Sequence, residues 1–400
     1  MRRRLAFLLF FTFSAASCLA ATYAGSRRTP VYVGSRVCAQ CHSGSGMGYQ
    51  FSKWLLSKHA KAYSVLSKPE AKLIAKLSGV PEEPQNSPIC LGCHATGAYA
   101  EEWEKDETFR VEDGVQCEKC HGPGSEYMAE DIMRDPKAAA QAGLQVPTRE
   151  DCLNCHQVKG SHVAVHKLPK LDIEKGWKAI AHPTPNSCSL GSKPKLPNEK
   201  NPKSPRYLGS IVCARCHKGP SMGYQYSKWR LSAHASAFAV LATPKAREIA
   251  KKSKVDGDPQ RSPQCLRCHA TGFSDTAGGF ADSFDVSEGV GCEACHGPGS
   301  EYIPEAVMRD PKAAKLAGLR KDSTVCLSCH KHAHGKEFDL DSFLKAIAHP
   351  TEPPKKISEV IYKTPLNLSL SPSGKELYVV CEASSSVIVV DVPSLKKVAE

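Results

Sequence analysis

The pattern Cys-x-x-Cys-His occurs eight times in this chain of 400 residues. Two thiols at this spacing can form thioether bonds to one porphyrin, and the adjacent imidazole can then bind its iron. The cysteines predicted to attach haem are Cys38, Cys41, Cys90, Cys93, Cys117, Cys120, Cys152, Cys155, Cys213, Cys216, Cys265, Cys268, Cys292, Cys295, Cys326 and Cys329. The predicted proximal iron ligands are His42, His94, His121, His156, His217, His269, His296 and His330.

Other uses of paired cysteines fit this pattern less well. Zinc ribbons, disulfide frameworks and thioredoxin-like redox pairs also contain Cys-x-x-Cys. None of them requires a histidine directly after the second cysteine, and the chain has only 16 histidines. We therefore predict eight covalently bound c-type haems and a function in electron chemistry. Cys188 and Cys381 are interpreted as bystanders.

The eight motifs form two sets of four. The first three motifs recur after 175 residues and the fourth after 174. The intervening text recurs as well, since 48–54 returns at 223–229 and 120–127 returns at 295–302. Such self-similarity indicates a tandem duplication of one structural unit.

We expect module 1 at 31–183, a linker rich in Pro, Lys and Asn at 184–205, and module 2 at 206–350. A module this small cannot build a large apolar core from its own side chains. The porphyrins would supply that core, so the predicted fold class is mainly α with low regular secondary structure.

Three helices can be predicted within module 1. The first covers 49–66. The second runs from Pro69 to Leu77, with Ser67 as its N-cap and proline in its first turn. The third covers 172–181 and ends before a proline.

The segment 356–400 contains no haem motif and no histidine. Residues 366–380 are predicted to form a strand, a turn and a second strand, and 386–392 a third strand. This pattern resembles one blade of a YVTN-type β-propeller, so we expect an incomplete blade at the front of a longer protein. The alternative is a small β appendage packed on the haem modules.

The first 20 residues predict a signal peptide, with three arginines before a short apolar stretch. Cleavage is expected after Ala20 or Ala24. Alternatively, 14–18 resembles a loose lipobox, which would make Cys18 a lipidated membrane anchor. The expected location is periplasmic or extracellular, and no later segment is apolar enough to span a membrane.

The formal charge of +12 could indicate a nucleic-acid partner. Losing the three leader arginines leaves about +9, and each oxidised haem contributes about −1 through its two propionates and ferric core. Eight haems would bring the charge close to neutral. The basic residues are therefore interpreted as propionate partners, and no nucleic-acid binding is expected.

Each module resembles the tetrahaem cytochrome c-554 family. The resemblance covers 31–183 and 206–350 and depends on Ser-Lys-Trp-(x)4-His, on Cys-His-Ala-Thr-Gly at the second motif, and on Gly-Val-x-Cys-Glu-x-Cys-His-Gly-Pro-Gly at the third. It implies closely packed haems that shuttle electrons in the periplasm between redox partner proteins.

The resemblance also implies distal ligands. His59 and His234 would ligate the third haem of each module, and His182 and His349 the fourth. The second haem would have no distal protein ligand and would be the open iron of each module.

The first haem departs from the family pattern, because tyrosine stands where a histidine is expected. The candidates that remain for its distal side are Tyr127, Tyr302, Met133, Met308, His162, His166, His332 and His334, among which His166 and His334 are preferred.

The favoured function is an octahaem electron carrier with mostly bis-histidine haems. The alternative is a multihaem oxidoreductase that acts on a small nitrogen species at the open second haem. The chain has no Cys-x-x-Cys-Lys motif of the kind that marks pentahaem nitrite reductases. A third hypothesis, compatible with the first, is that the propeller-like tail docks a partner.

Overall fold

The computed structural model describes 29–167, 171–182, 194–197, 203–273, 278–331, 334, 337–349, 365–381, 386–394 and 396–399. The predicted signal peptide, Cys18, Cys188 and His332 lie outside these residues, as does most of the predicted linker. None of the described helices is long and apolar enough to cross a membrane.

Short helices dominate both modules, as predicted. The helices of module 1 are α1 (Ser35–Cys38), η1 (Ser45–Met47), α2 (Gln50–Leu56), η2 (His59–Lys61), α3 (Ala62–Val65), α4 (Pro69–Leu77), α5 (Pro88–His94), η3 (Glu102–Glu104), η4 (Val111–Asp113), α6 (Glu118–His121), α7 (Glu130–Met133), α8 (Pro136–Gln141), η5 (Glu150–Asn154), α9 (Gly160–His166) and α10 (Ile173–Ile180).

Module 2 repeats most of this order. Its helices are α11 (Ser210–His217), η6 (Pro220–Met222), α12 (Gln225–Leu231), η7 (His234–Ser236), η8 (Ala239–Ala242), α13 (Pro244–Lys252), η9 (Pro259–Arg261), α14 (Pro263–His269), η10 (Val286–Glu288), α15 (Cys292–His296), α16 (Glu305–Arg309), α17 (Pro311–Leu316), η11 (Ser323–Cys326), α18 (Leu327–His330) and α19 (Leu340–Ile347). Two short strands, β1 (Arg206–Tyr207) and β2 (Gly279–Phe280), pair in parallel.

The single helix predicted over 49–66 is wrong. Helix α2 ends at Leu56, where Ser57 adopts extended backbone and donates its hydroxyl to the Trp54 carbonyl at 2.6 Å. The chain then restarts at His59 as η2. The break changes the direction of the chain just before His59, which a continuous helix could not do.

The other two helix predictions hold with small changes. Helix α4 starts at Pro69 as expected, but its N-cap is Lys68, which makes no side-chain cap bond. Helix α10 agrees with the third prediction, and the Asp172 carboxylate accepts from the Lys175 N–H at 3.0 Å.

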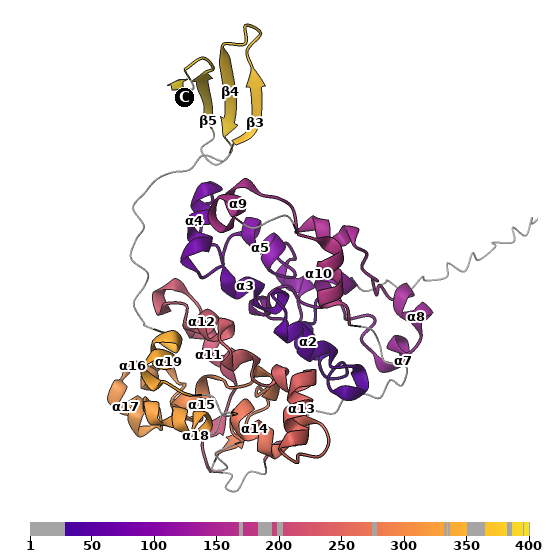
Figure 1. Ribbon diagram of the computed structural model, residues 1–400, viewed down its shortest axis with the longest axis vertical. Coiled ribbons are helices and arrows are strands. Elements are labelled where there is room, and N and C mark those ends of the chain that lie inside the picture. Colours follow the sequence, from indigo (N-terminus) through magenta and orange to yellow (C-terminus); the bar gives the residue numbers. More distant parts are fainter. Residues whose placement is uncertain are drawn as a thin grey trace, which may run out of the picture.

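A four-stranded antiparallel sheet lies near the C-terminus, apart from the helical body in Figure 1. Its strands are β3 (Pro365–Leu370), β4 (Glu376–Cys381), β5 (Ser386–Asp391) and β6 (Lys396–Ala399), and they pair in sequence order. Three of these strands were predicted, and β6 was not. The described residues of 365–399 form this one sheet and no closed ring of blades.

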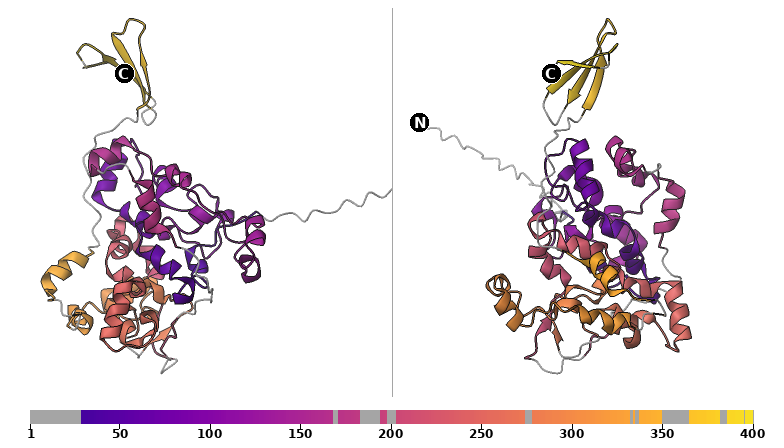
Figure 2. Two further views of the ribbon diagram at one scale, coloured as in Figure 1. Left: turned by 45° about the vertical axis from the view of Figure 1, so that its right-hand side comes forward. Right: turned by 60° about the vertical axis from the view of Figure 1, so that its left-hand side comes forward.

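The two modules lie side by side and contact each other through equivalent segments (Figures 1 and 2). Helix α2 of module 1 packs on η8 of module 2, and α12 of module 2 packs on α3 of module 1. The apolar part of this interface includes Phe51, Leu55 and Ala239. The duplicated modules therefore pair much as the subunits of a two-fold dimer do.

Hydrogen bonds repeat across this interface. The Gln85 amide donates to the Ser227 hydroxyl at 2.9 Å, and the Gln260 amide donates to the Ser52 hydroxyl at 2.9 Å. All four side chains are buried. Each bond joins the repeat-equivalent glutamine of one module to the repeat-equivalent serine of the other. The same two residue types therefore stabilise both halves of the interface.

One buried ionic cluster breaks this symmetry. Arg36 pairs with Asp113 at 3.1 Å and with Glu288 at 3.1 Å. Arg230 contacts Asp113 at 3.5 Å, and both of these side chains are 2% exposed. The repeat places Ile211 opposite Arg36 and Leu55 opposite Arg230. Each arginine therefore has an apolar counterpart in the other module.

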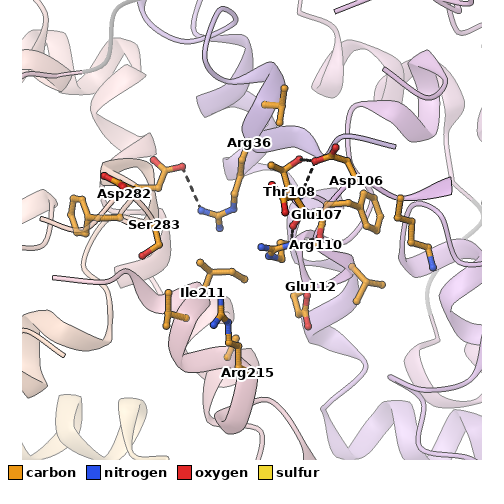
Figure 3. A pocket seen from close by; sticks show the side chains of 18 of the residues that line it. Arg36, Asp106, Glu107, Thr108, Arg110, Glu112, Ile211, Arg215, Asp282 and Ser283 are labelled. Carbon is orange, nitrogen blue, oxygen red and sulfur yellow. Dashed lines mark hydrogen bonds and ion pairs between the residues drawn. The ribbon is translucent and has the colours of Figure 1, made fainter. Parts of the chain in front are cut away.

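A cleft of about 720 Å³ lies between the modules beside this cluster. Figure 3 shows Asp282 and Ser283 of module 2 on one side, Thr108 and Arg110 of module 1 on the other, and Arg36 between them. The described residues that line it include no cysteine or histidine of a motif. Gln40 and Arg215, which lie between the cysteines of the first motif of each module, do line it, so the cleft adjoins these two motifs.

Replacing Asp113 should lower the free energy of unfolding, because Asp113→Ala removes the carboxylate that pairs with the buried Arg230. We expect a loss of about 3–5 kcal/mol in the free energy of unfolding, measured by urea titration followed by circular dichroism. The control is Glu305→Ala, which removes an exposed ion pair with Arg309 and should cost at most about 0.5 kcal/mol. Equal costs for the two variants would contradict this role of the cluster.

Candidate haem sites

Each motif forms one turn of helix, which brings its reactive groups together. In the first motif the His42 N–H donates to the Cys38 carbonyl at 2.9 Å, and the third and fourth motifs of module 1 make the same bond. Residues at positions i, i+3 and i+4 of a helix share a face. Both thiols and the imidazole of a motif therefore point to one side, where a single porphyrin could bind all three.

The thiols are available for covalent attachment. All sixteen motif cysteines are free, and all but Cys216 are partly buried. Within the described residues, no three side chains of His, Cys, Asp or Glu gather as they would around a structural zinc ion. The donor arrangement thus fits haem, with its two thioether bonds and axial imidazole.

Thiols of different motifs meet in the same order in both modules. The neighbouring Cys38 raises the pKa of Cys117, which links the first motif to the third. Burial, and then the neighbouring Cys93, raise the pKa of Cys155, which links the fourth motif to the second. Burial, and then the neighbouring Cys152, raise the pKa of Cys120, so the third and fourth motifs are also adjacent.

Module 2 repeats these three contacts. Its pairs are Cys213 with Cys292, Cys329 with Cys268, and Cys295 with Cys326. Both modules thus arrange their motifs in the order first, third, fourth, second.

Several motif imidazoles face a second imidazole. The ring centroids are 6.0 Å apart for His59 and His156, 6.0 Å for His121 and His182, 6.0 Å for His234 and His330, 5.8 Å for His296 and His349, and 6.4 Å for His269 and His334. A metal ion between two imidazoles needs two metal–nitrogen bonds of about 2 Å, which with the ring radii gives about 6 Å. These separations fit bis-histidine ligation.

The observed pairing differs from the one that the resemblance implies. His59 lies beside the fourth motif of module 1, and His182 lies beside the third. His234 and His349 repeat this exchange in module 2. In both modules each of these histidines thus lies beside the motif that the resemblance implies for the other.

Hydrogen bonds determine which ring nitrogen carries the proton in several of the motif imidazoles. The Nδ1 atoms of His94, His121 and His296 lie 2.9 Å from the backbone carbonyls of Ala62, Gln145 and Arg320, respectively. A carbonyl can only accept, so Nδ1 must carry the proton and Nε2 keeps its lone pair for a metal.

Burial favours the neutral, metal-binding form of these side chains. It lowers the pKa of His59, His121 and His234, and the facing imidazole lowers each pKa further. The protein around each pair therefore opposes protonation, which would block binding to iron.

The imidazole of each first motif has a different environment. Nδ1 of His42 lies 2.6 Å from the Gln50 side-chain oxygen, and Nδ1 of His217 lies 2.5 Å from that of Gln225. Within the described part of the chain, neither imidazole has a facing histidine ring. The two glutamines were not predicted as site residues, although both recur at the repeat offset.

Tyr127 and Tyr302, which replace the expected histidine, each donate a hydrogen bond to a backbone carbonyl. Both rings are buried. The Tyr127 hydroxyl donates to the Gly122 carbonyl at 2.7 Å, and that of Tyr302 donates to Gly297 at 2.6 Å. These bonds close the loop after the third motif, so both tyrosines have a structural role.

The remaining candidates differ in position. His162 and His166 share helix α9, where His162 is half-buried and His166 is exposed. His334 reaches the second motif of module 2. Met133 and Met308, at the ends of α7 and α16, are partly exposed. Their proposed ligation of the first haem stays a prediction.

The backbone before the third motif holds His59 in place. The Val115 N–H donates to the His59 carbonyl at 3.0 Å, and the Trp54 indole donates to the Val115 carbonyl at 2.8 Å. Gly114 has φ +72°, and a Cβ there would lie 2.7 Å from the His59 carbonyl oxygen. Only glycine fits this position, which explains why Gly-Val and Trp recur in module 2.

A buried glutamate inside each third motif anchors the start of its module. The Glu118 carboxylate accepts from the N–H groups of Val33, Gly34 and Gly124 at 2.7–2.8 Å. Glu293 makes the equivalent bonds in module 2. This carboxylate ties the segment before the first motif to the third motif, which keeps the two motifs adjacent.

Comparison with known proteins supports this chemistry. Two segments, 37–122 and 212–297, match the family model described as cytochrome c554 and c-prime, and each contains the first three motifs of a module. Cytochrome c-554 of Nitrosomonas europaea is 36% identical over 99 residues, which cover 24% of this chain and 40% of that protein. Both modules thus resemble cytochrome c-554 over these segments, and cytochromes of this kind carry covalently bound c-type haem.

A second relative is the multihaem cytochrome MtrA of Shewanella baltica, 30% identical over 112 residues. These cover 25% of this chain and 33% of the relative. The chain thus spans less than half the length of either protein. No solved structure matches it. The matches support a haem-protein role in electron transfer.

Replacing Gly114 should disturb His59 specifically. Gly114→Ala places a methyl group against the His59 carbonyl and also strains the backbone, so we expect a loss above about 2 kcal/mol in the free energy of unfolding. The control Gly143→Ala has the same kind of strain, at φ +103°, but no atom within 4 Å of its Cβ. It should cost about 1 kcal/mol. Urea titrations that gave equal costs would refute the steric argument.

Proposed function

We propose that this chain is an octahaem c-type cytochrome that carries electrons outside the cytoplasm through closely packed, mostly bis-histidine haems. The observation that carries the proposal is the set of facing imidazoles, whose ring centroids lie 5.8–6.4 Å apart. Two axial imidazoles fill both open positions of an iron, which favours electron transfer over substrate binding. The protein would then supply spacing and potential, while the haem supplies the redox chemistry.

We assign His59 and His234 to the fourth haem of their modules, and His182 and His349 to the third, because these rings face the corresponding motif imidazoles. The exposed His166 is not assigned to an iron. This assignment reverses the order implied by the family resemblance.

The thiol contacts support a path for electrons within each module. Haems bound to neighbouring thiols must themselves be neighbours. The order of the motifs therefore gives a path from the first haem through the third and fourth to the second. The repeated contacts in module 2 give it the same path.

The periplasmic or extracellular location and the signal peptide are proposed from the sequence, with a lipid anchor at Cys18 as the alternative to cleavage after Ala20 or Ala24. We also propose redox proteins, and no nucleic acid, as partners. Eight haems would nearly balance the charge of about +9 that remains without the leader arginines, and their propionates would pair with basic side chains.

We further propose that strands β3–β6 form a propeller-type blade. The meander order is that of one blade. Apolar side chains on the sheet are exposed, with Leu368 at 64% and Leu370 at 57%. A neighbouring blade would cover such side chains.

Distal-ligand variants test the electron-carrier proposal. His59→Ala and His234→Ala should each convert one low-spin haem into a high-spin haem that binds CO after reduction, and the double variant should convert two. The measurement is CO titration of the purified holoprotein followed by visible absorption. Lys58→Ala, beside His59 and exposed, is the control and should change nothing. An unchanged count in both histidine variants would contradict bis-histidine ligation.

A further inference from the structure

His334 faces the second motif of module 2. Its ring centroid lies 6.4 Å from that of His269, close to the separations at the third and fourth motifs. Nδ1 of His269 is 2.7 Å from the Ala237 carbonyl, which holds the proton on that nitrogen. The Nε2 lone pair of His269 is therefore left for a metal, with His334 within reach of the other axial position.

His162, on helix α9, is the candidate in module 1. Helix α9, which carries it, packs against α4, and a bond of 2.9 Å joins the hydroxyls of Ser161 and Ser78. Burial lowers the pKa of His162, and the nearby His94 lowers it further, so the two imidazoles are electrostatic neighbours. Four residues later, His166 is exposed on the same helix.

The two histidines are not equivalent in the repeat. His162 is the sixth residue after His156, whereas His334 is the fourth after His330. The local structure differs as well, because module 1 has helix α9 here and His334 stands at φ +52°. The two candidate ligands therefore stand on locally different backbone.

We propose that His334 is the distal ligand of the second haem of module 2 and that, by the repeat, His162 on helix α9 has this role in module 1, which closes the irons that the family resemblance leaves open. This inference rests on the proposed function, since it assumes a haem at every motif. It also removes the open iron on which the alternative reaction with a small nitrogen species depends. Added ligands are then restricted to the first haems, whose His42 and His217 have no facing imidazole in the described part of the chain.

The test uses the full-length, haem-loaded protein and its variants His162→Ala, His334→Ala and His166→Ala. After reduction, each sample is titrated with CO, and high-spin ferric haem is counted in the oxidised samples by electron paramagnetic resonance. The wild type should bind CO at no more than two of its haems. His162→Ala and His334→Ala should each add one CO-binding, high-spin haem per chain, and added imidazole should restore the low-spin state.

The controls distinguish a folding defect from the loss of an axial ligand, and failure of this inference from failure of the proposed function. His166→Ala, on the same helix as His162 but exposed, should leave the count unchanged. If an alanine variant loses haem, His162→Met keeps an axial ligand, so it should bind no extra CO and should raise the potential of one haem. Unchanged CO and high-spin counts in His162→Ala and His334→Ala would overturn this inference alone, provided that His59→Ala adds one CO-binding haem. If His59→Ala adds none either, bis-histidine ligation itself fails.

Discussion

The structure depends on pairs of imidazoles held at a fixed separation. A metal ion between two rings tolerates little change in distance, so the segments that carry the rings must be placed with the same accuracy. His59 and His156 lie far apart in the sequence, yet their ring centroids are 6.0 Å apart. The break after α2, the Gly114 turn and the Trp54 bond all serve this placement. Much of the irregular backbone is therefore needed for ligand geometry.

A second constraint is the small amount of apolar core. The helices are short, and the buried apolar clusters contain few side chains. Eight haems would fill the remaining interior and join segments that make few direct contacts. Pairing of the modules adds further burial, and the Arg36–Asp113–Arg230 cluster adds ion pairs across the interface.

Local sequence was enough to predict the motifs, the duplication, helices α4 and α10 and three of the four C-terminal strands. The pairing of imidazoles was not predictable in this way, because it depends on contacts between distant segments. The choice between His162 and His166 shows why. Both follow the fourth motif closely, and only the packing of α9 makes one half-buried and the other exposed. The ionic cluster at the interface could have been suspected from the repeat, because Arg36 and Arg230 stand where the other copy has apolar residues.

Every motif should carry a haem. Haems per chain can be counted in the purified protein with a pyridine haemochrome assay and an intact-mass measurement on the same sample. We expect eight haems on each polypeptide, four for each module. A count well below eight, or unmodified motif thiols in the folded protein, would contradict it.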